Sequence, residues 1–254
     1  MSIEVVEQLL RCSAVEVHRK VRYVLAFLTG LRDGEIAGLK FQDVFGGETQ
    51  VLSVNKQLRL EESGYREGPP KTDTSFRDVP LGALVLEAMQ WWFDEGWAAY
   101  VGHKATLVDL VFPSPSGKPW RPRSSELLRA DLYLAGLPTK FRGQIGFVFH
   151  RARGSFTSWL ARRGTPFDLR RALLGHGAVG VTDGSYEEQS ERLPQEIEKL
   201  VLAVTLDDLK RYESPGRKAI TAARKTAKDT ANHNVLGRRR IKAEAEKQKA
   251  KEDK

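Results

Sequence analysis

Six side chains, spread over most of this sequence, are of the types that phosphoryl-transfer chemistry uses. They are Arg32, Lys71, His150, Arg153, His176 and Tyr186. A guanidinium can hold two oxygens of a phosphate at once, a lysine or histidine can move a proton, and a tyrosine hydroxyl can attack phosphorus. Taken singly, each has a more ordinary explanation, because most arginines and lysines are solvated and most tyrosines pack in a core or interface. A phosphoryl-transfer site can therefore be inferred only from the order of these residues and their local context.

Arg32 lies in a turn between two predicted helices. Apolar residues at helical spacing predict a helix from Val15 to Leu28, which Gly30 ends, and a short helix follows from Gly34 to Leu39. A guanidinium in such a turn can project beside the N–H groups that open the second helix, where an oxyanion is favoured. The turn therefore predicts an anion-binding position for Arg32.

The second half of the chain carries the other arginine, both histidines and the tyrosine. His150 and Arg153 are three residues apart in a helix predicted from Phe149 to Arg163, so their side chains share one face. His176 follows a short apolar run, and Tyr186 comes ten residues later. We expect an imidazole and a guanidinium to lie together where the predicted helix begins.

Lys71 falls where the pattern changes from helical to extended. The segments from Gln50 to Lys56 and from Arg77 to Leu81 have the alternation or extended character of strands. Between them a Gly- and Pro-rich stretch from Ser63 to Lys71 predicts the turn of a small sheet. Lys71 is therefore expected at the tip of a β-hairpin, where its ammonium group could protonate a leaving 5′-alkoxide.

The other segments are mostly helical by periodicity, so the fold class is mainly α with a small antiparallel β-sheet (α+β). Further helices are predicted from Ile3 to Leu10, Leu84 to Tyr100, Ser124 to Ala135, Phe167 to Leu174 and Leu193 to Val204. Met89, Trp91, Trp92 and Trp97 are interpreted as core residues, because clustered tryptophans on a helix usually bury area.

Composition indicates a globular chain with an uneven charge distribution. Hydrophobic residues make up 41% of the sequence, and the formal net charge is +8. Residues 212–254 hold thirteen Lys and Arg but six Asp and Glu, so nearly all of the excess charge lies there. Cys12 is the single cysteine, which excludes an internal disulfide and a thiolate metal cluster. No long apolar run or signal segment stands out, so a cytoplasmic, DNA-associated location is expected.

Together these residues resemble the catalytic domain of the tyrosine recombinases, the family of phage integrases and resolving recombinases. The resemblance runs from about Arg32 to Tyr186 and rests on five motifs in the family's order. They are Thr29-Gly30-Leu31-Arg32 with Glu35 as the supporting acid, Lys71 followed by Arg77, Val79 and Pro80-Leu81, His150-x-x-Arg153, Leu174-Gly175-His176, and the nucleophile Tyr186. The chain departs from the family pattern at Ala152, Gly154 and Glu188, and the gap before Tyr186 is slightly longer than usual.

The resemblance implies a metal-independent enzyme of mobile genetic elements that needs no cofactor. Tyr186 would attack a phosphodiester of double-stranded DNA, forming a 3′-phosphotyrosine and freeing a 5′-hydroxyl that a second strand attacks in reverse. Bond energy is conserved, so no ATP is required. By the same resemblance, the protein would be a monomer or weak oligomer when free and a homotetramer on DNA during synapsis.

The resemblance also implies a role for each remaining residue. Arg32 and Arg153 would hold the nonbridging phosphate oxygens, and Lys71 would be the general acid. His150 would assist removal of the tyrosine proton, and His176 would hydrogen-bond the phosphate. Glu35 would orient a neighbouring cation.

The domain organisation is predicted from the same resemblance and from the charge distribution. Residues 1–211 are expected to form the catalytic domain, without the N-terminal DNA-binding domain that completes the family's clamp, as either an excised fragment or a natural minimal protein. Residues 212–254 are expected to be a basic, flexible tail, whose segment Arg238-Arg239-Arg240 would contact phosphates. The helix predicted from Leu193 to Val204 has an apolar stripe of Ile197, Leu200, Val201 and Val204, which could pack in cis or dock on a neighbouring subunit.

Two other functions stay open on the sequence. A type IB topoisomerase shares the nucleophile and the cationic pocket but relaxes supercoils, and a catalytically silent accessory protein could keep the fold to bind DNA. The segment Leu174-Gly175-His176 and its distance to Tyr186 favour a recombinase over the topoisomerase. A chemically competent residue at every catalytic position argues against the silent protein.

Overall fold

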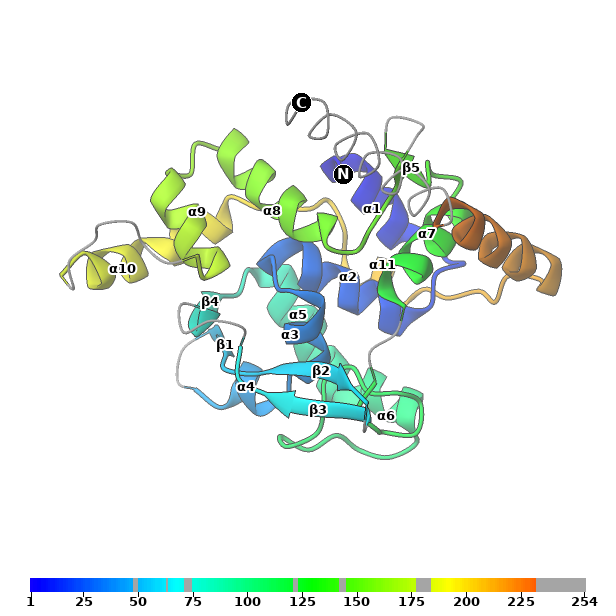
Figure 1. The fold of residues 1–254 in the computed structure, drawn as a ribbon, viewed down its shortest axis with the longest axis horizontal. Coiled ribbons are helices and arrows are strands. Elements are labelled where there is room, and N and C mark those ends of the chain that lie inside the picture. Colours follow the sequence, from blue (N-terminus) through cyan, green and yellow to red (C-terminus); the bar gives the residue numbers. More distant parts are fainter. Residues whose placement is uncertain are drawn as a thin grey trace, which may run out of the picture.

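Helices build most of the protein, as its computed structural model shows (Figure 1). The structure describes residues 1–47, 50–62, 64–70, 75–120, 123–141, 145–176 and 184–231, and at 141, 145 and 184–190 only the main chain. The helices up to the middle of the chain are α1 (Ile3–Arg11), α2 (Val17–Thr29), α3 (Asp33–Gly38), α4 (Gln42–Phe45), α5 (Ala83–Trp91), the π-helical η2 (Trp92–Gly96) and α6 (Trp97–Val101). Those that follow are α7 (Ser124–Leu134), α8 (Arg151–Arg162), α9 (Phe167–Leu174), α10 (Gly184–Glu198), α11 (Leu206–Lys210) and an unlabelled helix at 217–231.

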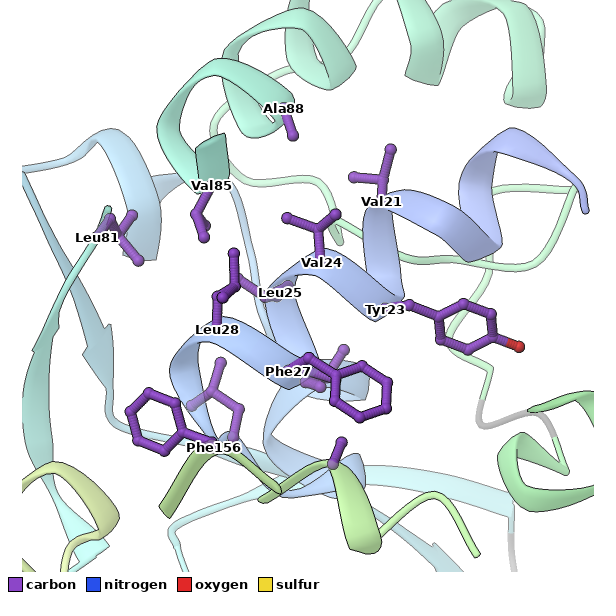
Figure 2. Close-up of a cluster of buried hydrophobic side chains, with 14 of the residues drawn as sticks. Val21, Tyr23, Val24, Leu25, Phe27, Leu28, Leu81, Val85, Ala88 and Phe156 are labelled. Atoms are coloured by element: carbon purple, nitrogen blue, oxygen red, sulfur yellow. The ribbon is translucent and has the colours of Figure 1, made fainter. Parts of the chain in front are cut away.

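Helix α2 runs through the centre of the core (Figure 2). Every residue from Lys20 to Thr29 is buried, and side chains of α5 and α8, such as Val85 and Phe156, lie on different sides of it. The predicted aromatic core is confirmed at Trp92 and Trp97, which are each 1% exposed. A helix surrounded on all sides is a rigid base, and the loop that follows its end carries Arg32.

The strands form three separate antiparallel pairs, as far as the described residues go. Strand β1 (Val51–Val54) pairs with β4 (Arg77–Pro80), β2 (Gln57–Glu61) with β3 (Gly64–Gly68), and β5 (Lys140–Phe141) with β6 (Ile145–Gly146). In the first pair Val51 lies opposite Pro80, and in the second Glu61 lies opposite Gly64. The α+β class is thus confirmed, with the small sheet divided into pairs.

The prediction of a single turn from Ser63 to Lys71 was wrong. Most of that stretch is strand β3, and the chain reverses between Glu61 and Gly64. Lys71 itself lies outside the described residues, three positions after β3 ends at Gly68. The hairpin escaped prediction because it is largely solvated: Leu60 is 66% exposed, so no apolar alternation marked it.

The prediction of a helix from Leu193 to Val204 was also wrong in both bounds. Helix α10 begins at Gly184 and ends at Glu198. Beyond it residues 200–205 form neither helix nor strand, and burial alternates: Leu200, Leu202 and Val204 are buried, whereas Val201 is 69% exposed. Ile197 and these three residues belong to the protein's own core, which favours the cis alternative over docking on a neighbour.

The first part of the tail predicted from residue 212 contains a regular helix. Residues 217–231 form a helix whose Ala223 and Ala227 pack against Ala130 of α7 and partly buried Leu134. Arg238, Arg239 and Arg240 lie outside the described residues. Within the described residues, no helix is both long and apolar enough to cross a lipid bilayer.

Candidate active site

Two helices end beside Arg153, and both ends aim carbonyl groups at it. Helix α2 ends at Gly30 (φ 65°) and α9 ends at Gly175 (φ 61°), both in the left-handed conformation that glycine adopts without strain. Arg153 Nη1 donates to the Gly30 carbonyl at 2.8 Å, and Nη2 donates to the Leu174 carbonyl. The last carbonyls of a helix lack partners within it and carry negative partial charge, so they suit a guanidinium.

Gly30 allows this arrangement because it has no side chain. A Cβ atom built there would lie 2.6 Å from Cδ1 of Phe156, which is on the same helix as Arg153. The close approach of Gly30 to α8 therefore fixes the position from which Arg153 reaches out. Arg153 is only 5% exposed, so its orientation is set by packing.

Arg32 is held by a buried carboxylate instead. Glu35 accepts from the Arg32 main-chain N–H at 2.8 Å and from Nη1 of the same arginine at 2.6 Å. Arg77, at the start of β4, donates to Glu35 Oε2 from Nη2 at 3.0 Å and to the Leu173 carbonyl from Nε at 2.9 Å. The predicted orienting role of Glu35 toward a neighbouring cation thus has a geometric basis, with two arginines as its partners.

The charges of this cluster shift one another's pKa values. Burial, together with the charges of Arg32 and Arg77, lowers the pKa of Arg153 to about 9, although the charge of Glu35 acts in the opposite direction. Burial alone would raise the pKa of Glu35, but its hydrogen bonds and charge contacts with Arg77 and Arg32 outweigh burial and hold that pKa below its ordinary value. Three guanidinium groups face one carboxylate, so the cluster has a surplus of positive charge.

Both predicted histidines lie beside the same cluster. His176 follows Gly175, and its Nε2 lies 3.2 Å from Arg153 Nη2; His150 is the residue that precedes α8. Burial, then the charges of Arg153 and Arg32, lower the pKa of each imidazole below its ordinary value. A neutral imidazole can accept from Arg153, which fits the contact of His176.

The structure thus brings together Arg32, Glu35, His150, Arg153 and His176. Two predicted residues are not among them: Lys71 lies outside the described residues, and of Tyr186 only the main chain is described, in the first turn of α10. Helix α10 packs against α9, which ends two residues before His176, and against β4, which contains Arg77. In the described part of the chain, no three His, Cys, Asp or Glu side chains meet in a metal-binding arrangement.

Arg77 is a site residue that sequence reasoning quoted but left without a role. Its signal was its place just before the strand residues Val79, Pro80 and Leu81, which predicted β4 but not what the side chain contacts. The structure shows that the Arg77 side chain is 6% exposed and ties three elements together, since it joins β4 to Glu35 of α3 and to Leu173 of α9.

Comparisons with known proteins agree with this geometry. A profile described as the phage integrase family matches residues 1–192. A "Tyrosine recombinase XerC-like" protein of Caldanaerobacter subterraneus subsp. tengcongensis is 30% identical over 193 residues, which are 68% of this chain and 46% of that protein. An "Integrase" of Streptomyces ambofaciens is 30% identical over 170 residues, 65% of this chain and 43% of that protein.

A solved structure shares the fold as well. The Tn1549 transposon integrase, determined with circular intermediate DNA, is 25% identical with a TM-score of 0.50, over 69% of this chain and 59% of that one. The chain spans about half the length of the curated relatives that it matches. Because the family profile covers most of the sequence, including both arginines and the tyrosine, the chain belongs to the phage integrase family.

Proposed function

We propose that this chain cleaves and rejoins DNA strands as a site-specific recombinase, with Tyr186 as the nucleophile. The observation that carries the proposal is the cluster of Arg32, Arg153 and His176, in which surplus positive charge is fixed at two helix ends. Such preorganised donors stabilise the charge that develops on a phosphate during transfer. Helix α10, which contains Tyr186, packs against α9, which ends two residues before His176, and against β4, whose Arg77 shares Glu35 with Arg32.

The chemistry exchanges one phosphodiester for another. The Tyr186 oxygen attacks phosphorus and the bond to the 5′-oxygen breaks, which leaves a 3′-phosphotyrosine and a 5′-hydroxyl. Arg32 and Arg153 bind the nonbridging oxygens, His176 adds a hydrogen bond, and His150 assists loss of the phenol proton. Lys71 supplies the proton that the departing 5′-oxygen needs. A second strand's 5′-hydroxyl then reverses these steps, so no external energy source enters.

The names of the relatives and the DNA present with the Tn1549 integrase support duplex DNA as the substrate. They favour recombination over the type IB topoisomerase and the silent accessory protein. Exchange between two duplexes breaks four strands, and each copy of the chain would supply one Tyr186. The recombination reaction therefore needs four copies of the chain, which we expect to assemble as a homotetramer on DNA from monomers or weak oligomers.

The test is capture of the covalent intermediate. A nicked duplex, from which the short 5′-hydroxyl fragment can diffuse away, should trap wild-type protein as an adduct that survives SDS. Tyr186→Phe should form none, because a phenyl ring has no attacking oxygen, whereas Tyr212→Phe, a matched change at an exposed position, should form it normally. An adduct with Tyr186→Phe would refute the assignment. Chelators should leave the yield unchanged.

The proposed role of Lys71 as general acid can be tested by changing the leaving group of the DNA substrate. Lys71→Ala should slow cleavage of ordinary DNA by about 10²–10⁴, the usual worth of a general acid. Replacing the 5′-bridging oxygen with sulfur should restore the rate, because a thiolate leaves without a proton. If the sulfur substrate is not rescued in a single-turnover assay, Lys71 binds phosphate instead of donating a proton.

A further inference from the structure

The helix at 217–231 is fastened to α7 on the side of the molecule away from α10 (Figure 1). Its inner face repeats at helical spacing, with Ile220 half-buried and Ala223, Ala227 and Thr230 buried. Arg129 of α7 donates from Nε to the Ala227 carbonyl at 3.0 Å. Small alanine side chains let the two helices approach closely, so the opposite face of this helix is held in a defined place.

Two adjoining cavities follow this contact. The first, about 400 Å³, is lined at one end by Asp33 and Leu60 and along α7 by Ser124 and Ser125. The second, about 480 Å³, continues to Arg224 and Lys228 of the 217–231 helix. Tyr65, Arg123 and Glu126 line both, so the two cavities form one groove, called here the α7 groove.

The α7 groove begins next to the candidate active site. Asp33, at its near end, directly follows Arg32 in the chain. The Ser124 hydroxyl donates to Asp33 at 2.7 Å, which ties the start of α7 to the start of α3. The near end of the α7 groove is therefore one residue along the chain from Arg32.

The charge of the groove favours an anion. Its two carboxylates are already in ion pairs, Asp33 with Arg22 at 2.6 Å and Glu126 with Arg123 at 3.6 Å. No carboxylate in the described part of the chain forms an ion pair with Arg224 or Lys228, and both are exposed. These two cations are one helical turn apart, about 6 Å along the axis, on the same face. Partly exposed Tyr65 and Trp120 add aromatic walls.

We propose that the α7 groove holds the sugar–phosphate backbone of the duplex DNA that flanks the cleavage site, with Arg224 and Lys228 as phosphate contacts. This inference rests on the proposed function, which makes DNA the substrate. A row of cations with aromatic walls fits a backbone of alternating phosphates and apolar sugars, and such contacts position DNA without reading its sequence. The first part of the predicted tail would thus act as a fixed DNA-binding element.

The experiment compares two charge-matched double variants on a duplex of arbitrary sequence. Arg224→Ala with Lys228→Ala removes the two cations of the groove. Lys218→Ala with Lys225→Ala removes two exposed cations of the same helix that do not line it. The first pair should raise Kd about tenfold at low salt and lower the slope of log K against log[salt] by about 1.8, since each phosphate contact contributes about 0.9. The second pair should stay within about twofold of wild type.

A third variant tests whether the placement of the helix matters. Ala223→Glu should detach the helix from α7 while keeping every cation, and we expect the same loss of affinity as with the first pair. The proposal would be overturned if both double variants lost the same DNA affinity, or if Ala223→Glu kept full affinity. Either result would mean that the cations of this helix attract DNA regardless of where they lie. Loss confined to a single-stranded oligonucleotide would also overturn it, since the groove would bind an unpaired strand.

These outcomes are separable from failure of the proposed function. At a protein concentration below its Kd, the Arg224→Ala/Lys228→Ala variant should form the covalent adduct more slowly than wild type, in proportion to its weaker binding, whereas Lys218→Ala/Lys225→Ala should match wild type. If wild type forms no adduct, the recombinase proposal fails while the binding comparison still tests the groove. A slower adduct with unchanged binding would contradict the groove as a docking surface.

Discussion

Arg153 and Arg32 belong to one cluster but are held in opposite ways. Arg153 is 5% exposed and is fixed by two main-chain carbonyls and an imidazole. Arg32 has a side chain that is 29% exposed, and its strongest contact is the carboxylate of Glu35. Neutral main-chain dipoles thus position Arg153, whereas the charge of Glu35 positions Arg32. Glu35 in turn is held by its ion pair with Arg77.

This contrast assigns different tasks to the two halves of the cluster. No described carboxylate touches Arg153, so an arriving phosphate would be the first anion in direct contact with it. That contact would offset the burial and repulsion that lower its pKa to about 9. Arg32 already has its counter-charge and more freedom to move, so its contribution depends on how firmly Glu35 is itself held.

The largest expected effect in this comparison is at Arg153. Arg153→Gln removes the buried positive charge that is proposed to bind a phosphate oxygen, so we expect single-turnover cleavage to fall by about 10²–10³. Arg19→Gln is the control, because Arg19 is also a well-packed arginine but pairs with Asp131 at a distance from the cluster. If both variants cleave equally slowly, the loss reflects general destabilisation and not the site.

A smaller effect on rate but a clear one on stability is expected at Glu35. Glu35→Gln leaves Arg77 buried without a counter-charge, which typically costs about 3 kcal/mol in the free energy of unfolding, and cleavage should slow because Arg32 loses its orientation. Asp43→Asn is the control, because Asp43 is also a buried carboxylate and pairs with Lys56 at 2.6 Å. This substitution should lower the free energy of unfolding without slowing cleavage by the folded protein.

The same carboxylate gives the stability a pH dependence. The pKa of Glu35 is lower in the folded protein than its ordinary value, so its contribution is complete above the ordinary pKa and is lost as pH falls through the lowered one. Chemical denaturation at several acidic pH values should show a shallower decline for Glu35→Gln than for wild type. Parallel declines would mean that other groups dominate.

The smallest effect is expected at His176. A glutamine there can still accept from Arg153, so His176→Gln should slow cleavage less than tenfold, the worth of about one hydrogen bond. Wild-type cleavage should persist somewhat below pH 6.5, because the pKa of His176 lies under its ordinary value, and decline only as pH falls through that lowered pKa. His103→Gln, at an exposed position, should leave the pH–rate profile unchanged.

The sequence predicted best the elements that bury a face. The helix ending at Gly30 and the helices of the core followed from apolar periodicity, whereas the grouping of Arg32 with His150, Arg153 and His176 followed from the resemblance to the tyrosine recombinases. These features are determined within a few turns of chain, or by motifs whose order a family shares. Tertiary contacts then reinforced what the local pattern already indicated.

Features that depend on long-range or weakly apolar contacts could not be predicted. The hairpin of β2 and β3 is mostly solvated, and the irregular segment after α10 has apolar residues that also fit helical spacing. The 217–231 helix packs through alanines, which carry little hydrophobic signal. Arg77 lies 42 residues from Glu35 along the chain, so only the folded structure reveals their ion pair.

Gly30 has a consequence for how this protein tolerates change. The residue ends α2 in a left-handed conformation, lies against Phe156 and offers its carbonyl to Arg153. Any side chain there would strain the main chain and displace the helix on which Arg153 stands. In a comprehensive mutational scan, loss of folding and loss of catalysis should coincide at this position. Gly30 would score as a core residue, although its carbonyl touches the active-site guanidinium.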